Sequence, residues 1–89
     1  MTDIHDTLAE RGERYNRFPN NARTAQAIKD QYRETPNWYE LDDHMCEALD
    51  VIASKIARII NGDPTYKDNW VDIMGYCQLV LNELEGAGE

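Results

Sequence analysis

Apolar residues recur every three or four positions over most of the chain, which is the spacing of amphipathic helices. The clearest run covers residues 43–60, and a second strong run covers residues 66–84. The apolar side of the first run consists of Met45, Ala48, Leu49, Ile52, Ala53, Ile56, Ile59 and Ile60. Alternation of apolar and polar residues over several positions, which would indicate a strand, does not occur. The pattern therefore predicts an all-α fold.

Three groups of helix-breaking residues divide this pattern into four helices. They lie at residues 18–21, 35–37 and 61–64, and each contains a proline. Proline cannot donate a backbone hydrogen bond, and it disfavours the helical conformation of the residue before it. We expect helices over roughly residues 3–14, 21–34, 43–60 and 66–84. Asp42 is the expected N-cap of the third helix, and Gly62, which is able to take a positive φ angle, is expected to end it.

The short connection between the last two predicted helices indicates an antiparallel helical hairpin. If the turn is centred between Asp63 and Pro64, residues at the same height can be read from the helical rise. Lys55 then lies beside Asp72, and Arg58 lies beside Asn69. This register would bring the polar sides of the two helices together.

The length of 89 residues allows a single domain over residues 1–89. A four-helix domain of this size buries only about 60% of its unfolded surface, which makes it marginally stable as a monomer. Its Trp and Tyr content also indicates aromatic surface that another subunit covers. We therefore expect a homo-oligomer.

The overall charge excludes several classes of protein. Acidic residues number 17 against 9 Lys and Arg, which gives a net charge of −8. Such a surface repels DNA, so we expect no nucleic-acid partner. The sequence contains no apolar stretch of about 20 residues and begins without a signal peptide, so we expect no membrane association and a cytoplasmic location. Cys46 and Cys77 form no metal-binding or disulfide pattern, and both are expected to be reduced and buried.

Carboxylates at helical spacing form the first candidate site. Glu47 and Asp50 are three residues apart on the third predicted helix, and Asp68 and Asp72 are four apart on the fourth. Two such pairs facing each other across a hairpin could hold Mg²⁺, which prefers carboxylate and phosphate oxygens. The alternative is that they form a solvated surface with ordinary salt bridges, including Lys55–Asp72 and Arg58–Asp68.

Basic and aromatic residues form the second candidate site. In an acidic protein a local group of cations is informative, because the remaining surface cannot hold an anion. A phosphate and a stacked base could be held by these groups, with Asp72 positioning the cations. The candidate ligand-binding residues are Arg14, Tyr15, Lys55, Arg58 and Tyr76. Arg11 and Arg17 flank the same tyrosine. The alternative for the aromatic residues, Trp38 and Trp70 included, is packing at the ends of a small core.

Several segments together resemble a family of small phage and prophage proteins of unknown function. The segments that carry the resemblance are residues 10–18, 22–27, 47–59, 61–64 and 68–76. The helix with Lys55 and Arg58, followed by Asp68, Asp72 and Tyr76, is more distantly similar to phage relatives of the MazG-like all-α nucleoside triphosphate pyrophosphatases. That resemblance implies helical oligomers that handle nucleotides with Mg²⁺. Those enzymes carry an ExxE pair followed by an ExxD pair, whereas this chain has Glu47 with Asp50 and then Asp68 with Asp72.

Three functional hypotheses follow. The leading one is a phage-encoded accessory protein, located in the cytoplasm of a bacterial host, that binds a nucleotide or a nucleotide-derived signal. The second is an Mg²⁺-dependent nucleoside triphosphate pyrophosphatase that uses the four carboxylates. The third is a non-catalytic acidic protein that binds a basic surface of a host protein.

Overall fold

The protein is all-helical. The computed structural model describes the backbone of residues 4–87 and the side chains of residues 17–86. The elements are α1 (Ile4–Arg33), a short 3-10 helix η1 (Pro36–Glu40), α2 (Asp43–Asn61) and α3 (Lys67–Ala87). No strand occurs within residues 4–87. The predicted all-α class is confirmed.

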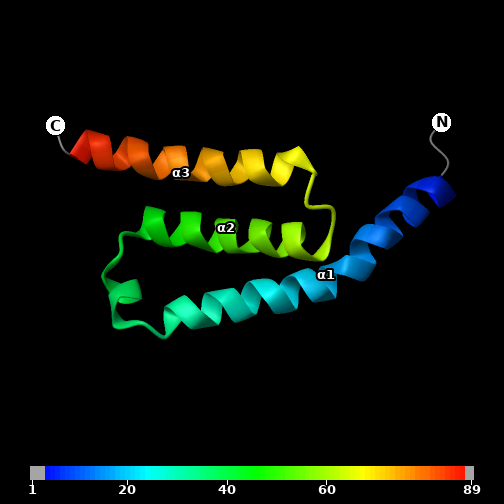
Figure 1. The fold of residues 1–89 in the computed structure, drawn as a ribbon, viewed down its shortest axis with the longest axis horizontal. Helices are drawn as coiled ribbons and strands as arrows, with labels where there is room; N and C mark the ends of the chain where they lie inside the picture. The colour runs from blue at the N-terminus through cyan, green and yellow to red at the C-terminus, as the bar shows by residue number, and fades with distance from the viewer. Residues whose placement is uncertain (1–3, 88–89) are drawn as a thin grey trace.

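The three long helices lie side by side in a single layer with α2 in the middle (Figure 1). α1 and α3 both run antiparallel to α2 and flank it on opposite sides. The molecule measures 53 × 29 × 21 Å, so one dimension is little more than two helix diameters. The predicted hairpin of the last two helices is confirmed. The layer leaves two broad faces of α2 without cover from either neighbour.

The predicted break between the first two helices is wrong. One helix, α1 (Ile4–Arg33), continues through Pro19 and covers the region where two helices, 3–14 and 21–34, were expected. The described residues 4–87 therefore form three α-helices instead of four. A proline inside a helix costs about 3 kcal/mol and usually bends the axis. The axis of α1 changes direction between its two halves (Figure 1). The second half is attached to α2 just after the proline, because the Asn61 side chain donates to the Asn20 carbonyl at 3.3 Å and to Thr24 Oγ1 at 3.0 Å. These tertiary contacts help offset the local cost.

The helices meet through small residues. The buried apolar residues among those described are Ala25, Ala48, Ala53 and Ala57. Alanine lets helix axes approach closely, but it buries little apolar area. No large side chain in the described part is fully buried, and many large apolar side chains are exposed. Even so, none of the described helices is long and apolar enough to cross a membrane.

The two ends of α2 agree with the predicted positions but differ in detail. Asp42 is the N-cap residue, yet its side chain makes no capping hydrogen bond. Gly62 ends the helix as predicted, and it does so with φ −130° without using the positive φ region that is open to glycine. Glycine is favoured there for another reason: a Cβ atom would lie 2.9 Å from the Arg58 carbonyl oxygen, which is too close. A close backbone approach therefore explains this glycine.

Candidate functional site

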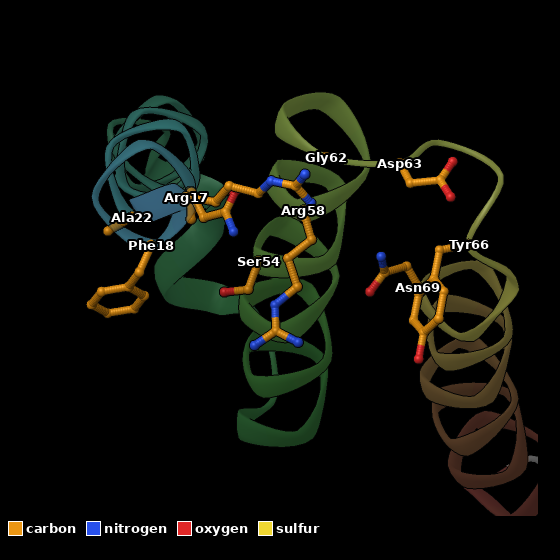
Figure 2. Close-up of a pocket in the computed structure, with 11 residues that line it drawn as sticks. Arg17, Phe18, Ala22, Ser54, Arg58, Gly62, Asp63, Tyr66 and Asn69 are labelled. Atoms are coloured by element: carbon orange, nitrogen blue, oxygen red, sulfur yellow. The ribbon is translucent and has the colours of Figure 1, made fainter. Parts of the chain in front are cut away.

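A cavity of about 680 Å³ opens on one face of the layer, near the turn between α2 and α3. Its walls come from the middle of α1 on both sides of Pro19, the last turns of α2, and the start of α3 with the segment before it (Figure 2). Its lining residues are Arg17, Phe18, Asn21, Ala22, Ala25, Ser54, Arg58, Gly62, Asp63, Tyr66 and Asn69. This volume lies within the range of about 300–1,000 Å³ that is usual for small-molecule sites.

Two arginines supply positive charge to the cavity. Within residues 17–86 neither Arg17 nor Arg58 forms an ion pair with a carboxylate. Arg58 stands on α2 in the middle of the cavity, and Arg17 reaches across from α1 to the C-terminal end of α2 (Figure 2). There, Arg17 Nη1 lies 3.6 Å from the position that a Cβ on Gly62 would occupy. In a protein with a net charge of −8, this cavity is a local positive site.

Two aromatic rings flank Arg58. Phe18 lies on the α1 side and Tyr66 lies on the α3 side of the cavity (Figure 2). Both rings are more than half exposed, at 64% and 53%. The Tyr66 hydroxyl donates to Asp68 Oδ2 at 2.9 Å, which fixes the tip of that ring. Exposed aromatic faces beside a guanidinium can stack on a planar ligand.

Two asparagines add hydrogen-bonding groups. Asn69 is a buried polar residue with only 8% of its surface exposed. The Asn21 Oδ1 atom is buried and has no hydrogen-bond partner among the described residues. A buried polar atom without a partner is unfavourable, so a ligand donor at this position would be stabilising.

Asp63 is the one carboxylate among the lining residues, and Thr65 engages it. Its Oδ1 accepts hydrogen bonds from Thr65 Oγ1 at 2.6 Å and from the Thr65 backbone N–H at 2.9 Å. These bonds, and to a smaller extent the charge of Arg17, hold the pKa of Asp63 below its ordinary value. The negative charge is thus fixed at the edge of the cavity by the turn that leads into α3.

The predicted register of the hairpin is confirmed. In this register Lys55 forms an ion pair with Asp72 and does not line the cavity. Lys55 Nζ lies 2.8 Å from Asp72 Oδ2, as the height argument predicted. Arg58 and Asn69 line the same cavity, which agrees with the same register. Arg58, however, does not pair with Asp68. The alternative that both cations form salt bridges is right for Lys55 and wrong for Arg58.

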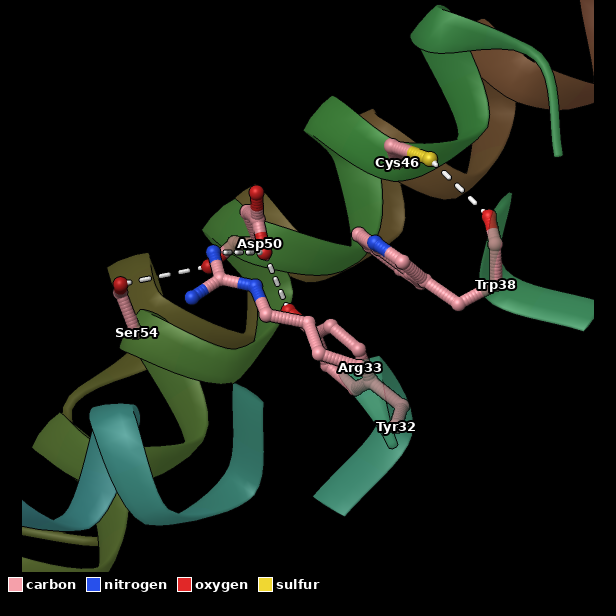
Figure 3. Close-up of polar contacts among 6 residues, drawn as sticks. All are labelled: Tyr32, Arg33, Trp38, Cys46, Asp50 and Ser54. Atoms are coloured by element: carbon pink, nitrogen blue, oxygen red, sulfur yellow. Dashed lines mark hydrogen bonds and ion pairs between the residues drawn. The ribbon is translucent and has the colours of Figure 1, made fainter. Parts of the chain in front are cut away.

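Asp50, one of the predicted metal ligands, joins α2 to the end of α1 (Figure 3). It accepts a short hydrogen bond from the Tyr32 hydroxyl and forms an ion pair with Arg33 Nη2 at 3.3 Å. Burial, together with the hydrogen bond to Asp50, raises the pKa of Tyr32 above its ordinary value. The Tyr32 ring also stacks on Trp38, with ring centroids 4.3 Å apart. Trp38 therefore has the packing role that was one of its two predicted roles. The environment of Asp50 is that of a structural contact.

The other predicted carboxylates and Tyr76 lie apart from Arg58. Glu47 and Tyr76 line a smaller cavity of about 220 Å³ between α2 and α3, together with His44 and Glu83. Asp68 accepts from Tyr66, and Asp72 pairs with Lys55. Across the part of the chain that the structure describes, no group of three or more His, Cys, Asp or Glu is arranged to hold a metal ion. The four carboxylates are therefore not gathered at one centre.

The sequence identified part of this cavity. Among the candidate ligand-binding residues whose side chains are described, Arg58 lines the cavity and Lys55 and Tyr76 do not. The side chains of the other two candidates, Arg14 and Tyr15, lie outside the described residues. Phe18, Asn21, Tyr66 and Asn69 were not selected as site residues. Asn69 could have been found from the hairpin register, which placed it beside Arg58. Asn21 stood at the start of a predicted helix, whereas in the structure α1 continues through it.

The cysteines also differ from expectation. Both are free thiols, as predicted, but Cys46 is half-buried and Cys77 is exposed. Burial, with smaller contributions from Asp43 and Asp50, raises the pKa of the Cys46 thiol. Its Sγ lies 3.8 Å from the Trp38 carbonyl oxygen (Figure 3). Cys46 therefore acts as a packing residue at the α1–α2 end of the layer.

A scan against protein-family models gave no match, and searches of curated proteins and of solved structures gave none either.

Proposed function

We propose that the protein binds a nucleotide, or a small molecule derived from one, in the cavity around Arg58. The observation that carries this proposal is one cavity of an acidic protein that combines two exposed aromatic rings with two arginines, neither of which forms an ion pair within residues 17–86. Nucleotides combine a phosphate with a planar base, and the cavity offers groups that suit both parts. The distant resemblance of the segment with Lys55, Arg58, Asp68, Asp72 and Tyr76 to MazG-like nucleoside triphosphate pyrophosphatases motivates the same proposal.

Each part of the ligand has a counterpart. Arg58 and Arg17 present guanidinium groups, which bind phosphate oxygens through paired N–H donors. Phe18 or Tyr66 offers a ring face on which a base can stack. Asn21 Oδ1 accepts a hydrogen bond from an amino or imino group at the edge of the base, and Asn69 lies at the bottom of the same site. The cavity volume of about 680 Å³ accommodates a ligand of this size.

Binding is better supported than hydrolysis. A metal-dependent pyrophosphatase needs carboxylates that converge on a cation. In the described residues Asp50 is engaged by Tyr32 and Arg33, and Asp72 is engaged by Lys55. The remaining two, Glu47 and Asp68, lie in different surroundings. The proposal therefore assigns no role to Mg²⁺.

Isothermal titration calorimetry against a nucleotide panel tests the proposal. The panel contains nucleoside mono- and triphosphates and cyclic dinucleotides, and at least one member is expected to bind. Arg58→Gln is expected to weaken that affinity about 10- to 100-fold, because a charge-assisted hydrogen bond contributes about 1.5–3 kcal/mol. The affinity should also fall as the salt concentration rises.

Arg23→Gln is the matched control, since Arg23 is an exposed arginine on the same helix as Arg17 but does not line the cavity. It should leave the affinity unchanged. The proposal fails if no member of the panel releases heat, or if Arg58→Gln and Arg23→Gln bind equally well.

A further inference from the structure

Five exposed residues form a continuous stripe along α3. They are Trp70, Met74, Cys77, Leu81 and Leu84, and their spacing of four, three, four and three residues is that of a coiled-coil seam. Trp70, Met74, Leu81 and Leu84 are 52%, 72%, 47% and 47% exposed, and Cys77 is also exposed. A heptad spacing keeps these side chains on one side of the helix over two full repeats.

This stripe is not the side of α3 that packs on α2. Asn69 is buried, and Asp72 reaches Lys55 on α2, so these residues mark the α2 side. At 3.6 residues per turn, the centre of the stripe lies about 100° around α3 from Asn69 and about 160° from Asp72. The apolar seam is therefore additional to the hairpin contact. Its first residue, Trp70, donates through Nε1 to the Pro64 carbonyl oxygen at 2.8 Å, and the ring remains 52% exposed.

The exposed apolar surface continues onto α2, on the face away from the cavity. Leu49 and Ile60 are 39% and 66% exposed. By helical spacing they lie roughly opposite Ser54 and Arg58, which line the cavity. One face of the layer thus carries the candidate ligand site, and the other is apolar.

The core of the described residues is small. No large side chain there is fully buried, and the buried apolar residues are Ala25, Ala48, Ala53 and Ala57. Packing of a second chain on the apolar face would add buried apolar area to this core.

We propose that a second copy of this chain covers the apolar face, with the two α3 helices packed antiparallel about a two-fold axis near Cys77. Residue 77 is the centre of the stripe, so this arrangement places Trp70 of one copy opposite Leu84 of the other. Between Trp70 and Leu84 the positions beside the seam, Val71, Ile73, Gln78 and Val80, carry no charge. Two strongly acidic chains can therefore meet there without placing like charges in contact.

Charge at the two ends of α3 favours the antiparallel direction. Lys67 stands at the start of the helix and Glu85 near its end, and both lie on the same side as the stripe. In the antiparallel pair Lys67 of one copy lies within about one helical turn of Glu85 of the other. A parallel pair would instead place like charges at each end. The pairing leaves the cavity around Arg58 open, so this inference does not depend on the proposed function.

Sedimentation velocity and equilibrium measurements of the intact chain test the pairing. The wild type is expected to sediment as a dimer or a multiple of dimers at micromolar concentration. Leu81→Glu introduces a charge into the seam and should weaken association at least 100-fold, while circular dichroism remains helical. Leu79→Glu is the matched control, because Leu79 is similarly exposed at 58% but lies on the other side of α3. It should assemble like the wild type.

Cross-linking of the wild-type protein provides a second measurement that needs no destabilising variant. A short bismaleimide should link two chains through Cys77, and Cys77→Ser should abolish the linked species while Cys46→Ser retains it. A wild-type protein that is monomeric over the whole concentration range, a Leu81→Glu variant that associates normally, or a dimer that does not cross-link through Cys77 would each overturn the proposal.

Discussion

α2 is attached to its two neighbours by contacts of different kinds. On the α1 side, Asp50 receives two donors, the Tyr32 hydroxyl and the Arg33 guanidinium, and Asn61 binds α1 near the other end of α2. On the α3 side, the polar contact between the described residues of the two helices is one ion pair, Lys55–Asp72, whose carboxylate is 45% exposed. Asp50, in contrast, is 26% exposed. Hydrogen bonds and an ion pair thus attach α1 to α2 at two positions along the helix. α3 is attached to α2 by apolar packing and one solvated ion pair.

The two kinds of contact have different consequences for how firmly each neighbouring helix is held against α2. Contacts with several donors in a partly buried place specify geometry, because misalignment leaves polar groups without partners. An exposed ion pair contributes little and tolerates movement. The α1–α2 pair therefore forms the rigid part of the cavity wall, and α3 is the helix best suited to adjust when another chain packs on its outer side.

The largest expected effect comes from breaking the close packing of α2. Ala57 is completely buried, and Ala57→Leu would push α2 away from its neighbours. We expect the free energy of unfolding to fall by about 3 kcal/mol, because this alanine has no space for a larger side chain. Urea denaturation measures the change. Ala27→Leu on the exposed side of α1 is the control and should change stability by less than about 0.5 kcal/mol.

A smaller effect tests the two sides of α2 directly. Asp50→Ala should lower the free energy of unfolding by about 2 kcal/mol, since it leaves the partly buried Tyr32 hydroxyl without its acceptor. Asp72→Ala removes only the solvated ion pair with Lys55 and should cost less than about 1 kcal/mol. The same denaturation experiment ranks the two variants. Equal losses would show that the two sides are held alike, contrary to the comparison.

The smallest effect is a pH dependence located on the α1 side. The pKa of Tyr32 is raised in the folded protein, so folding favours the protonated phenol. This contribution is fully present below pH about 10, where an unfolded tyrosine is protonated, and it is lost as the pH rises further. We expect Tyr32→Phe to lose less stability than the wild type as the pH rises above about 10.

The exposed Tyr39 supplies the control for this measurement. Tyr39→Phe should follow the wild-type pH profile in the same denaturation series. If both variants behave alike, the alkaline loss of stability does not come from the contact with Asp50.

Local sequence determined the parts of the fold whose causes lie close together in the chain. The apolar spacing gave the helical class and the limits of α2 within about one residue. The short turn at residues 62–66 set the antiparallel hairpin, and the helical rise then placed Lys55 beside Asp72 and Arg58 beside Asn69. These predictions depend only on one short turn and two regular helices, so the helical rise was sufficient to make them.

Tertiary structure decided what depended on distant residues. A local rule places a helix end at Pro19, but Asn61, some forty residues later, attaches to Asn20 and Thr24 and supports a continuous α1. The partners of Asp50 likewise come from α1 and could not be deduced from spacing on α2. The cavity exists only where all three helices meet, which is why the sequence identified Arg58 and not Phe18, Asn21 or Tyr66 as its neighbours. Periodicity fixes which side of a helix is apolar; the side that meets a given partner depends on the packing of the whole chain.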